Sequence, residues 1–248
     1  MAVDFRRDGV RSSLVWDVLS TVVSARVATT GRPALDIVDV GGGTGGLAVP
    51  FAALGHNVTV VDPSPDALAA AQRRAAEAAA RLTSVQGEAA SLDSVVGPGA
   101  ADLVICHNVL EYVEEPADAM SAIARVLRPS ATVSVIASNA VAAVLHRALA
   151  GRFAEARRLL MSGGTPLTAP ASPLGRRFTL PELTALVEQA GLRAGEAHGL
   201  RIFGGLVPGA LLEGDAAAAE ALRALEEAAA STPPLRDIAA QLHVLGHH

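Results

Sequence analysis

Apolar and polar positions alternate along the chain in two rhythms, one typical of helices and one typical of buried strands. Residues 10–28 repeat apolar side chains at helical spacing, which predicts an amphipathic helix. Short apolar runs predict strands at residues 34–40, 56–61, 83–86, 101–107, 131–138, 192–207 and 238–244. Helical patterns lie between most of these runs, at residues 45–55, 64–82, 116–127, 178–191 and 215–230. Strands joined by helical crossovers favour a mostly parallel sheet with helices on both faces.

This rhythm breaks near residue 148. From there to residue 177 the chain contains several glycines and prolines and has no strand pattern. We interpret residues 148–177 as an inserted helical lid and residues 1–30 as an N-terminal helix, both within a single domain of 248 residues. The predicted fold class is therefore α/β.

Composition excludes several classes of protein. Half of the residues are hydrophobic and the formal net charge is only -5, which excludes a disordered chain. No unbroken apolar run reaches about 18 residues, so we expect neither a transmembrane helix nor a membrane partner. The first eight residues carry four charges without a following apolar run, which argues against a secretory signal. A single cysteine, Cys106, excludes an internal disulfide, and we expect a cytoplasmic protein.

The sharpest chemical signal is a glycine-rich turn between the first predicted strand and the helix after it. The sequence reads DVGGGTGG from Asp39 to Gly46. Glycines at such a turn let the main chain approach a ligand and present its amide groups. The same spacing satisfies the fingerprint of dinucleotide sites, so the motif alone does not choose between ligands.

Three further features narrow the choice of ligand. Asp39 directly precedes the glycines, where a carboxylate can hold an ammonium group and would repel a pyrophosphate. Asp62 ends the second strand, where an acid can accept the hydroxyl groups of a ribose. The third feature is the segment DLVICHNVLEY at residues 102–112, followed by LRPS at residues 127–130.

As a set, these segments resemble the class I S-adenosyl-L-methionine-dependent methyltransferases over residues 35–138. The resemblance implies a Rossmann-like, seven-stranded sheet with an antiparallel last strand. It also implies that S-adenosyl-L-methionine lies across the carboxyl ends of strands 1, 2 and 4, and that the product is S-adenosyl-L-homocysteine. The residues it implies are Asp39, Gly41 and Gly42 for the methionine part, Gly43 as a further cofactor contact, Asp62 for the ribose, Ala90 and Ser91 for the adenine, and His107 near the sulfonium. Glu88 is an alternative neighbour of the adenine.

A narrower resemblance, to the bacterial tRNA 5-carboxymethoxyuridine methyltransferases, covers most of the chain. It implies that Arg11 contacts the methionine carboxylate and that the methyl acceptor is the carboxylate of a modified wobble uridine in tRNA. The chain departs from that family between Leu160 and Arg177, where it lacks a lysine-rich run. A methyltransferase acting on the oxygen or nitrogen of a small metabolite is therefore the alternative. The matching segments are residues 9–11, 108–112, 138–140, 151–153, 180–191, 199–203 and 241–244.

Charge in one region suits an anionic acceptor. Residues 147–201 contain eight arginines and four glutamates, which predicts a basic face for a tRNA backbone or a carboxylate. Arg201, Arg177 and Arg158 are the candidates that steer this acceptor, and His107 is either a substrate contact or a buried, hydrogen-bonded histidine. We assign no catalytic base, because a carboxylate acceptor is already ionised near neutral pH.

Other classes of function are less well supported. A dinucleotide-binding oxidoreductase is disfavoured by Asp39, and a non-catalytic protein with a nucleoside pocket is a further alternative. We expect no metal site, because His243, His247 and His248 lie in a strand pattern or at the end of the chain without clustered ligands. The sequence does not determine the oligomeric state.

Overall fold

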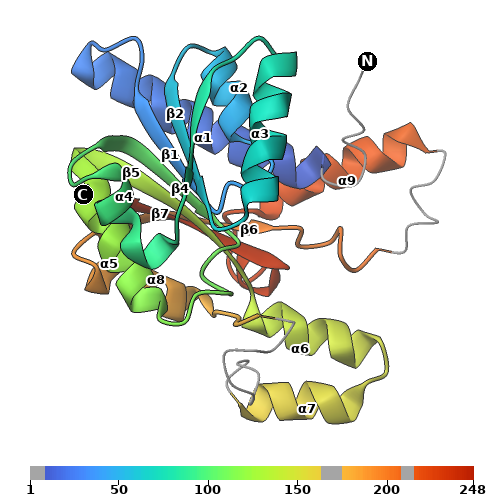
Figure 1. Ribbon diagram of the computed structural model, residues 1–248. Coiled ribbons are helices and arrows are strands. Elements are labelled where there is room, and N and C mark those ends of the chain that lie inside the picture. Colours follow the sequence, from blue (N-terminus) through green and yellow to red (C-terminus); the bar gives the residue numbers. More distant parts are fainter. Residues whose placement is uncertain (1–8, 163–174, 208–214) are drawn as a thin grey trace. The chain divides into compact units, whose positions relative to one another are not determined.

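The computed structural model describes residues 9–162, 175–207 and 215–248, with the backbone alone for residues 9–13 (Figure 1). The chain divides into two compact units. Unit 1 comprises residues 1–20, 138–181 and 197–243, and unit 2 comprises residues 21–137, 182–196 and 244–248. The prediction of one domain with a lid at residues 148–177 remains a prediction, and residues 163–174 of that lid lie outside the described residues.

A seven-stranded sheet has the order β3-β2-β1-β4-β5-β7-β6. The strands are β1 (Asp36–Val40), β2 (Asn57–Asp62), β3 (Leu82–Gln86), β4 (Ala101–His107), β5 (Leu127–Ser138), β6 (Arg193–Leu200) and β7 (Gln241–His247). The pairs β1–β2, β2–β3, β1–β4 and β4–β5 are all parallel. The predicted α/β fold with a mostly parallel sheet is confirmed.

The last strand runs against its neighbour. The backbone N–H of His248 donates to the carbonyl of Ala131 at 3.0 Å, whereas a side chain added at Gly246 would meet Val133. Residue numbers therefore fall along β7 as they rise along β5, which is the sense of an antiparallel pair. The sheet is mixed, as the resemblance implies.

Helices cover both sides of the strands in unit 2. Figure 1 shows α2 (Ala48–Ala53) and α3 (Pro65–Glu77) on one side of these strands, and α4 (Leu92–Val96) and α5 (Pro116–Val126) on the other. The start of α3 follows from its sequence, because the Ser64 side chain accepts from the Ala67 N–H and Pro65 occupies the first turn. The remaining elements with residues here are α1 (Gly9–Thr30), η1 (Ala89–Ser91) and α8 (Leu180–Gln189).

Unit 1 contains α6 (Ala140–Leu149), α7 (Phe153–Met161), α9 (Ala216–Ala229) and η3 (Arg236–Ile238). Asn139, which is buried, organises the start of α6. Its side chain accepts from the Val141 N–H at 3.0 Å and donates to the carbonyls of Asp237 and Ala239 at 2.9 and 2.8 Å. The helix is a correction to the sequence analysis, which predicted no helix between the strand ending at residue 138 and residue 148. None of the helices within the described residues is both long and apolar enough to span a membrane.

Several element boundaries also differ from the prediction. Strand β5 begins at Leu127 rather than at residue 131, although Pro129 lies near its start. The first part of the predicted strand at residues 192–207 forms β6, which ends at Leu200 because Arg201 adopts a positive φ of 59°. Helix α3 ends at Glu77, and Ala79 with a φ of 51° stops the pattern from continuing to residue 82.

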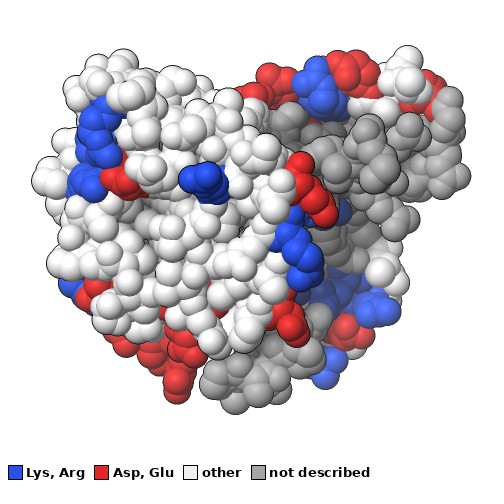
Figure 2. All heavy atoms as spheres, turned by 45° about the horizontal axis from the view of Figure 1, so that its top comes forward, with Lys and Arg blue, Asp and Glu red and all other residues white. Residues whose placement is uncertain are grey.

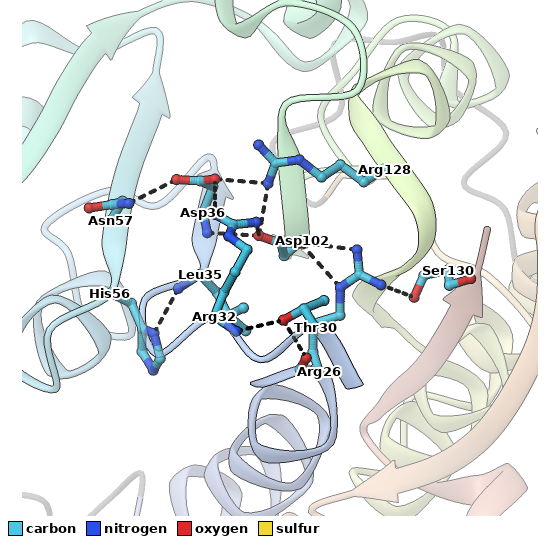
Figure 3. Close-up of polar contacts among 10 residues, drawn as sticks. All are labelled: Arg26, Thr30, Arg32, Leu35, Asp36, His56, Asn57, Asp102, Arg128 and Ser130. Atoms are coloured by element: carbon cyan, nitrogen blue, oxygen red, sulfur yellow. Dashed lines mark hydrogen bonds and ion pairs between the residues drawn. The ribbon is translucent and has the colours of Figure 1, made fainter. Parts of the chain in front are cut away.

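A group of charged residues joins the amino ends of β1 and β4 (Figure 3). Asp102, only 1% exposed, receives hydrogen bonds from Arg26 at 3.1 and 3.2 Å and from Arg32 and Arg128 at 2.8 Å. Arg32 and Arg128 also pair with Asp36 at 2.7 and 2.8 Å. Burial raises the pKa of Asp102, but the Asp36 N–H and the arginines outweigh it and hold that pKa below its usual value.

Candidate functional site: an acid-lined cavity at the carboxyl ends of the strands

A cavity of about 600 Å³ lies in unit 2, within the size range of cofactor pockets. Each part of its wall comes from the carboxyl end of a parallel strand or from the segment after it. Such edges of α/β sheets are where ligands bind. The lining residues are Val40 and Gly41 at β1, Asp62 and Pro63 at β2, Gly87 to Ala90 after β3, and Asn108, Val109, Tyr112 to Glu115 and Asp118 after β4.

The glycine turn is required by close packing at two positions. Gly41 has a φ of 63°, and a side chain there would overlap that of Val109. At Gly42, an added Cβ would lie 2.7 Å from the carboxyl group of Asp39 and 3.0 Å from Val60. The turn is anchored by the Gly41 N–H, which donates to the Val61 carbonyl at 2.7 Å. Gly41 therefore exposes bare main chain to the cavity, whereas Gly42 lies over Asp39.

Asp62 joins the glycine turn to the second strand and lines the cavity. One carboxylate oxygen accepts from the Gly43 N–H at 3.0 Å, and the other accepts from the Ser64 N–H at 2.9 Å. These bonds fix the orientation of the side chain. Each oxygen of a carboxylate can accept a second hydrogen bond, so Asp62 retains capacity for two donors of a ligand.

Asp39 lies beneath the glycine turn and is only 4% exposed. It is not among the residues that line the cavity. Burial, and secondarily the charge of Asp62, raise the pKa of Asp39 to about 7, although the Ala48 N–H opposes them. The predicted contact to an ammonium group remains a prediction, and such a group would favour the ionised form of this acid.

The other predicted ligand residues have different positions. Ala90 lines the cavity, whereas Ser91 does not and donates its hydroxyl to the Glu88 carbonyl at 3.3 Å. Gly43 also lies outside the lining. His107 is half-buried at the end of β4, where its Nε2 lies 2.7 Å from the Ser134 hydroxyl. Arg11 belongs to α1, but its side chain lies outside the described residues.

Sequence reasoning missed much of one wall. Asn108 and Tyr112 line the cavity but were not selected as ligand residues, and Tyr112 is 70% exposed. Their position after β4 was the available signal, because segments that follow parallel strands form such sites. Glu88, considered for the adenine, is also part of the lining.

The cavity is strongly acidic. Five carboxyl groups line it, and none of the described residues in its wall is basic. Such a wall favours a cationic ligand and disfavours a phosphorylated one. The acids are Asp62, Glu88, Glu114, Glu115 and Asp118.

The part of the arginine-rich region in unit 1 carries a basic charge that is partly compensated. Arg147 and Arg152 both lie near Glu155, at 3.5 and 4.0 Å, so part of the charge is compensated. Arg157 and Arg158 line a separate hollow of about 480 Å³ on α7. On the face drawn in Figure 2, several small groups contain charges of both signs, one basic side chain stands alone, and a mainly acidic group lies at the lower left. Among the described residues, no group of three potential metal ligands occurs.

Comparisons with known proteins agree with this geometry. A family model described as a methyltransferase domain matches residues 38–135, which include the glycine turn, Asp62 and β4. The ubiquinone biosynthesis O-methyltransferase of Burkholderia pseudomallei (strain 1710b) is 32% identical over 175 residues, covering 68% of each chain. The chain belongs to the class I S-adenosylmethionine-dependent methyltransferases.

Two further methyltransferases are similar. The tRNA 5-carboxymethoxyuridine methyltransferase of Escherichia coli (strain K12) is 31% identical over 146 residues, which are 58% of this chain and 54% of that one. The match thus spans about half the length of that relative. The magnesium protoporphyrin IX methyltransferase from Synechocystis PCC 6803, crystallised with bound SAH, superposes with a TM-score of 0.58 at 18% identity, over 100% of this chain and 89% of that one. That likeness supports the fold.

The cavity fits the methyl donor that these methyltransferases use. Its volume suits a nucleoside with an amino-acid arm. The main chain at Gly41 forms a cradle that a side chain would fill, and Asp62 has spare acceptor capacity. The donor's sulfonium is cationic, which matches the acidic wall.

Proposed function

We propose that this methyltransferase transfers a methyl group from S-adenosyl-L-methionine to the carboxylate of an anionic acceptor. The favoured acceptor is a 5-carboxymethoxyuridine-like wobble nucleotide in tRNA. The observation on which this rests is the acid-lined cavity in which the glycine turn and Asp62 meet at the carboxyl ends of β1 and β2.

In this proposal each wall of the cavity binds one part of the donor. Asp62 accepts the two ribose hydroxyls, and the segment from Glu88 to Ala90 lies along the adenine. The glycine turn and Asp39 hold the methionine arm, where an ammonium group keeps Asp39 ionised. When bound, the donor supplies an electrophilic methyl group on a good leaving group. The protein then has to orient the two reactants and exclude water.

The acceptor chemistry explains why no general base is required. A carboxylate with an ordinary pKa near 4 is fully ionised at neutral pH and is itself the nucleophile. The similarity to the tRNA 5-carboxymethoxyuridine methyltransferase supports this acceptor class. A five-acid cavity repels such an anion, so we infer that basic residues outside the cavity hold the acceptor.

A second candidate is a small-molecule methyltransferase. It is favoured by the ubiquinone biosynthesis O-methyltransferase, whose match covers 68% of each chain, compared with 54% of the tRNA enzyme. In this alternative the same cavity and donor are used, and only the acceptor differs.

Donor binding is tested by calorimetry with S-adenosyl-L-methionine and S-adenosyl-L-homocysteine. We expect Asp62→Asn to weaken both ligands about tenfold or more, because hydrogen bonds to a charged partner contribute about 1.5–3 kcal/mol. Asp66→Asn, an exposed acid in the first turn of α3, is the matched control and should bind like the wild type. If the folded wild type produces no heat with either ligand, the proposal is wrong.

The acceptor is tested separately. Mass spectrometry of tRNA nucleosides from cells with and without the gene should reveal loss of a methyl ester on the wobble uridine. Unchanged nucleosides, together with intact donor binding, would reject tRNA and favour the small-molecule alternative.

A further inference from the structure

Arg201 in unit 1 has a main-chain conformation that a non-glycine residue rarely adopts. Its φ is 59°, in the left-handed region. This conformation is unfavourable for a residue with a Cβ. The neighbours on both sides, Leu200 and Ile202, are buried, whereas Arg201 itself is exposed. The chain thus places an exposed arginine on a strained residue whose neighbours on both sides are buried.

A buried acid holds the turn after Arg201. Glu226 on α9 is 5% exposed and accepts from three successive backbone N–H groups, those of Ile202, Phe203 and Gly204, at 2.7, 2.8 and 2.6 Å. Three consecutive N–H groups that point at one spot form an anion-binding nest, here filled by a side chain of the same chain. Hydrogen bonds of this charged kind are about twice as strong as neutral ones.

The main chain around Arg201 is fixed by further contacts. The Arg201 carbonyl accepts from the Ala240 N–H at 3.3 Å. Ile202 packs with Ala229 and Ala239 in a buried cluster. The backbone of Arg201 is thus held on both sides, and its guanidinium is presented from a rigid support.

An imidazole faces the same turn. His146 on α6 contacts Gly205 so closely that an added Cβ there would lie 3.3 Å from its Nε2. Burial lowers the pKa of His146, and the charges of Arg201 and Arg147 lower it further. Arg147 is partly compensated by Glu155 at 3.5 Å. Asp17 and Glu227 share a small cavity with Arg201, but within the described residues Arg201 forms no ion pair.

We propose that Arg201 and His146 form an oxyanion-binding site for the anionic part of the methyl acceptor, and that Glu226 is the positioning residue for Arg201. The site rests on the proposed function for its biological role. Its chemistry is that of a guanidinium fork beside an imidazole, which suits a carboxylate or a phosphate. The acid-lined donor cavity offers no such partner for an anion.

The test follows the imidazole resonances of His146 by NMR in the full chain, with inorganic phosphate or acetate as the probe. The His146 signals are assigned from their loss in His146→Gln. We expect saturable shifts and a raised His146 pKa when the probe binds, because a nearby anion favours the imidazolium. Arg201→Gln should weaken the probe about tenfold, while Arg193→Gln, an exposed arginine on β6, should not. The proposed site would be overturned if the His146 signals shift equally with the probe in Arg201→Gln and Arg193→Gln, or if they do not shift in the wild type.

The two probes distinguish the source of the anion. Stronger binding of phosphate indicates a phosphorylated or nucleic-acid acceptor, and stronger binding of acetate indicates recognition of the carboxylate. Both results support the oxyanion site. An S-adenosyl-L-homocysteine titration of the same samples keeps this test separate from that of donor binding, which does not depend on His146 or Arg201.

The role of Glu226 needs its own variant. Glu226→Gln retains the size of the side chain but loses its charge, so the turn should loosen. We expect weaker phosphate binding and an unchanged affinity for S-adenosyl-L-homocysteine, measured where circular dichroism shows a fully folded chain. Phosphate affinity equal to that of the wild type would reject the positioning role. Glu220→Gln, an exposed acid on the same helix, is the control.

Discussion

Asp36 and Asp39 lie on the same strand, three residues apart, yet they have opposite surroundings. At the amino ends of β1 and β4, Asp36 and Asp102 are surrounded by three arginines, and the pKa of each is lowered. At the carboxyl ends, Asp39 pairs with no arginine of the described residues, and burial beside Asp62 raises its pKa to about 7. The two ends of one sheet therefore use the same side chain for different purposes.

The amino-end acids contribute to stability, because ionising them is more favourable in the folded protein than in the unfolded chain. The carboxyl-end acid does the reverse, since its ionised form is destabilised by burial. Perturbed acids of the second kind gather at functional sites, where a ligand provides the missing charge. We conclude that unit 2 separates folding and ligand binding between the two ends of its strands.

The largest expected loss of stability is at the amino end. Asp102→Asn leaves Arg26, Arg32 and Arg128 around a neutral amide, and we expect the free energy of unfolding to fall by about 3–4 kcal/mol. Urea denaturation at pH 7 measures this. Asp93→Asn is the control, because its pair with Arg125 is exposed and such pairs contribute little. Similar losses for both variants would contradict the role assigned to the arginine cluster.

The second prediction concerns pH at the opposite end. The pKa of Asp39 is raised in the folded state, so the folded chain binds more protons than the unfolded chain between about pH 4 and 7. Its contribution to stability therefore falls as pH rises through that window and stays low above it. Asp39→Asn removes this loss, so the variant should gain about 4 kcal/mol relative to the wild type between pH 4 and 8, since the pKa of Asp39 rises from about 4 to about 7 and one pKa unit corresponds to about 1.4 kcal/mol.

The measurement is the free energy of unfolding of both proteins at several pH values without ligand. Asp102→Asn is the informative comparison, because the pKa of Asp102 is lowered in the folded state. Ionised Asp102 therefore stabilises the folded protein at pH values above its pKa in the unfolded chain, and this stabilisation is lost as the pH falls. If the free energies of unfolding of the wild type and of Asp39→Asn change in parallel with pH, Asp39 does not have the raised pKa that distinguishes the carboxyl ends of the strands from the amino ends.

The sequence predicted the ligand site at the carboxyl ends of the strands far better than the cluster of Arg26, Arg32 and Arg128 at their amino ends. Asp62 and the glycines adjoin predicted strands, so their meeting follows from the rule that carboxyl ends of parallel strands share one edge. Arg26, Arg32 and Arg128 are 76, 70 and 26 residues from Asp102, and no local pattern links them. The LRPS segment indicated the end of a helix and contributed to the resemblance, but neither use of it predicted the tertiary contacts that Arg128 makes.

Details within the ligand end also depended on three-dimensional structure. Ser91 was expected beside the adenine, but the 3₁₀ turn directs its hydroxyl to the Glu88 carbonyl. Helix α6 was missed because the apolar pattern of β5 continues into it with only Asn139 between them. That residue is a helix cap in the structure, and its buried bonds to residues 237 and 239 could not be inferred from its neighbours.

A third prediction tests the close packing of the glycine turn at the ligand site. Gly42→Ala places a Cβ 2.7 Å from the Asp39 carboxyl and 3.0 Å from Val60, so the glycine turn must shift. We expect the affinity for S-adenosyl-L-homocysteine to fall about tenfold, which corresponds to about 1.4 kcal/mol. Gly46→Ala is the matched control, because the nearest atom to its Cβ is Arg74 Nη1 at 3.8 Å. If calorimetry gives equal affinities for the two variants, the glycine turn does not take part in binding the ligand.

The smallest expected effect is at His107, the last residue of β4. Its Nε2 is bonded to the Ser134 hydroxyl at 2.7 Å, and neither residue lines the cavity. Ser134→Ala removes one buried hydrogen bond, so we expect the free energy of unfolding to fall by about 1 kcal/mol and the affinity for S-adenosyl-L-homocysteine to change less than about twofold. Ser94→Ala, whose hydroxyl bonds locally to the Ser91 carbonyl on the surface, should change neither quantity. If Ser134→Ala instead weakens the binding of S-adenosyl-L-homocysteine without affecting stability, His107 acts on the ligand.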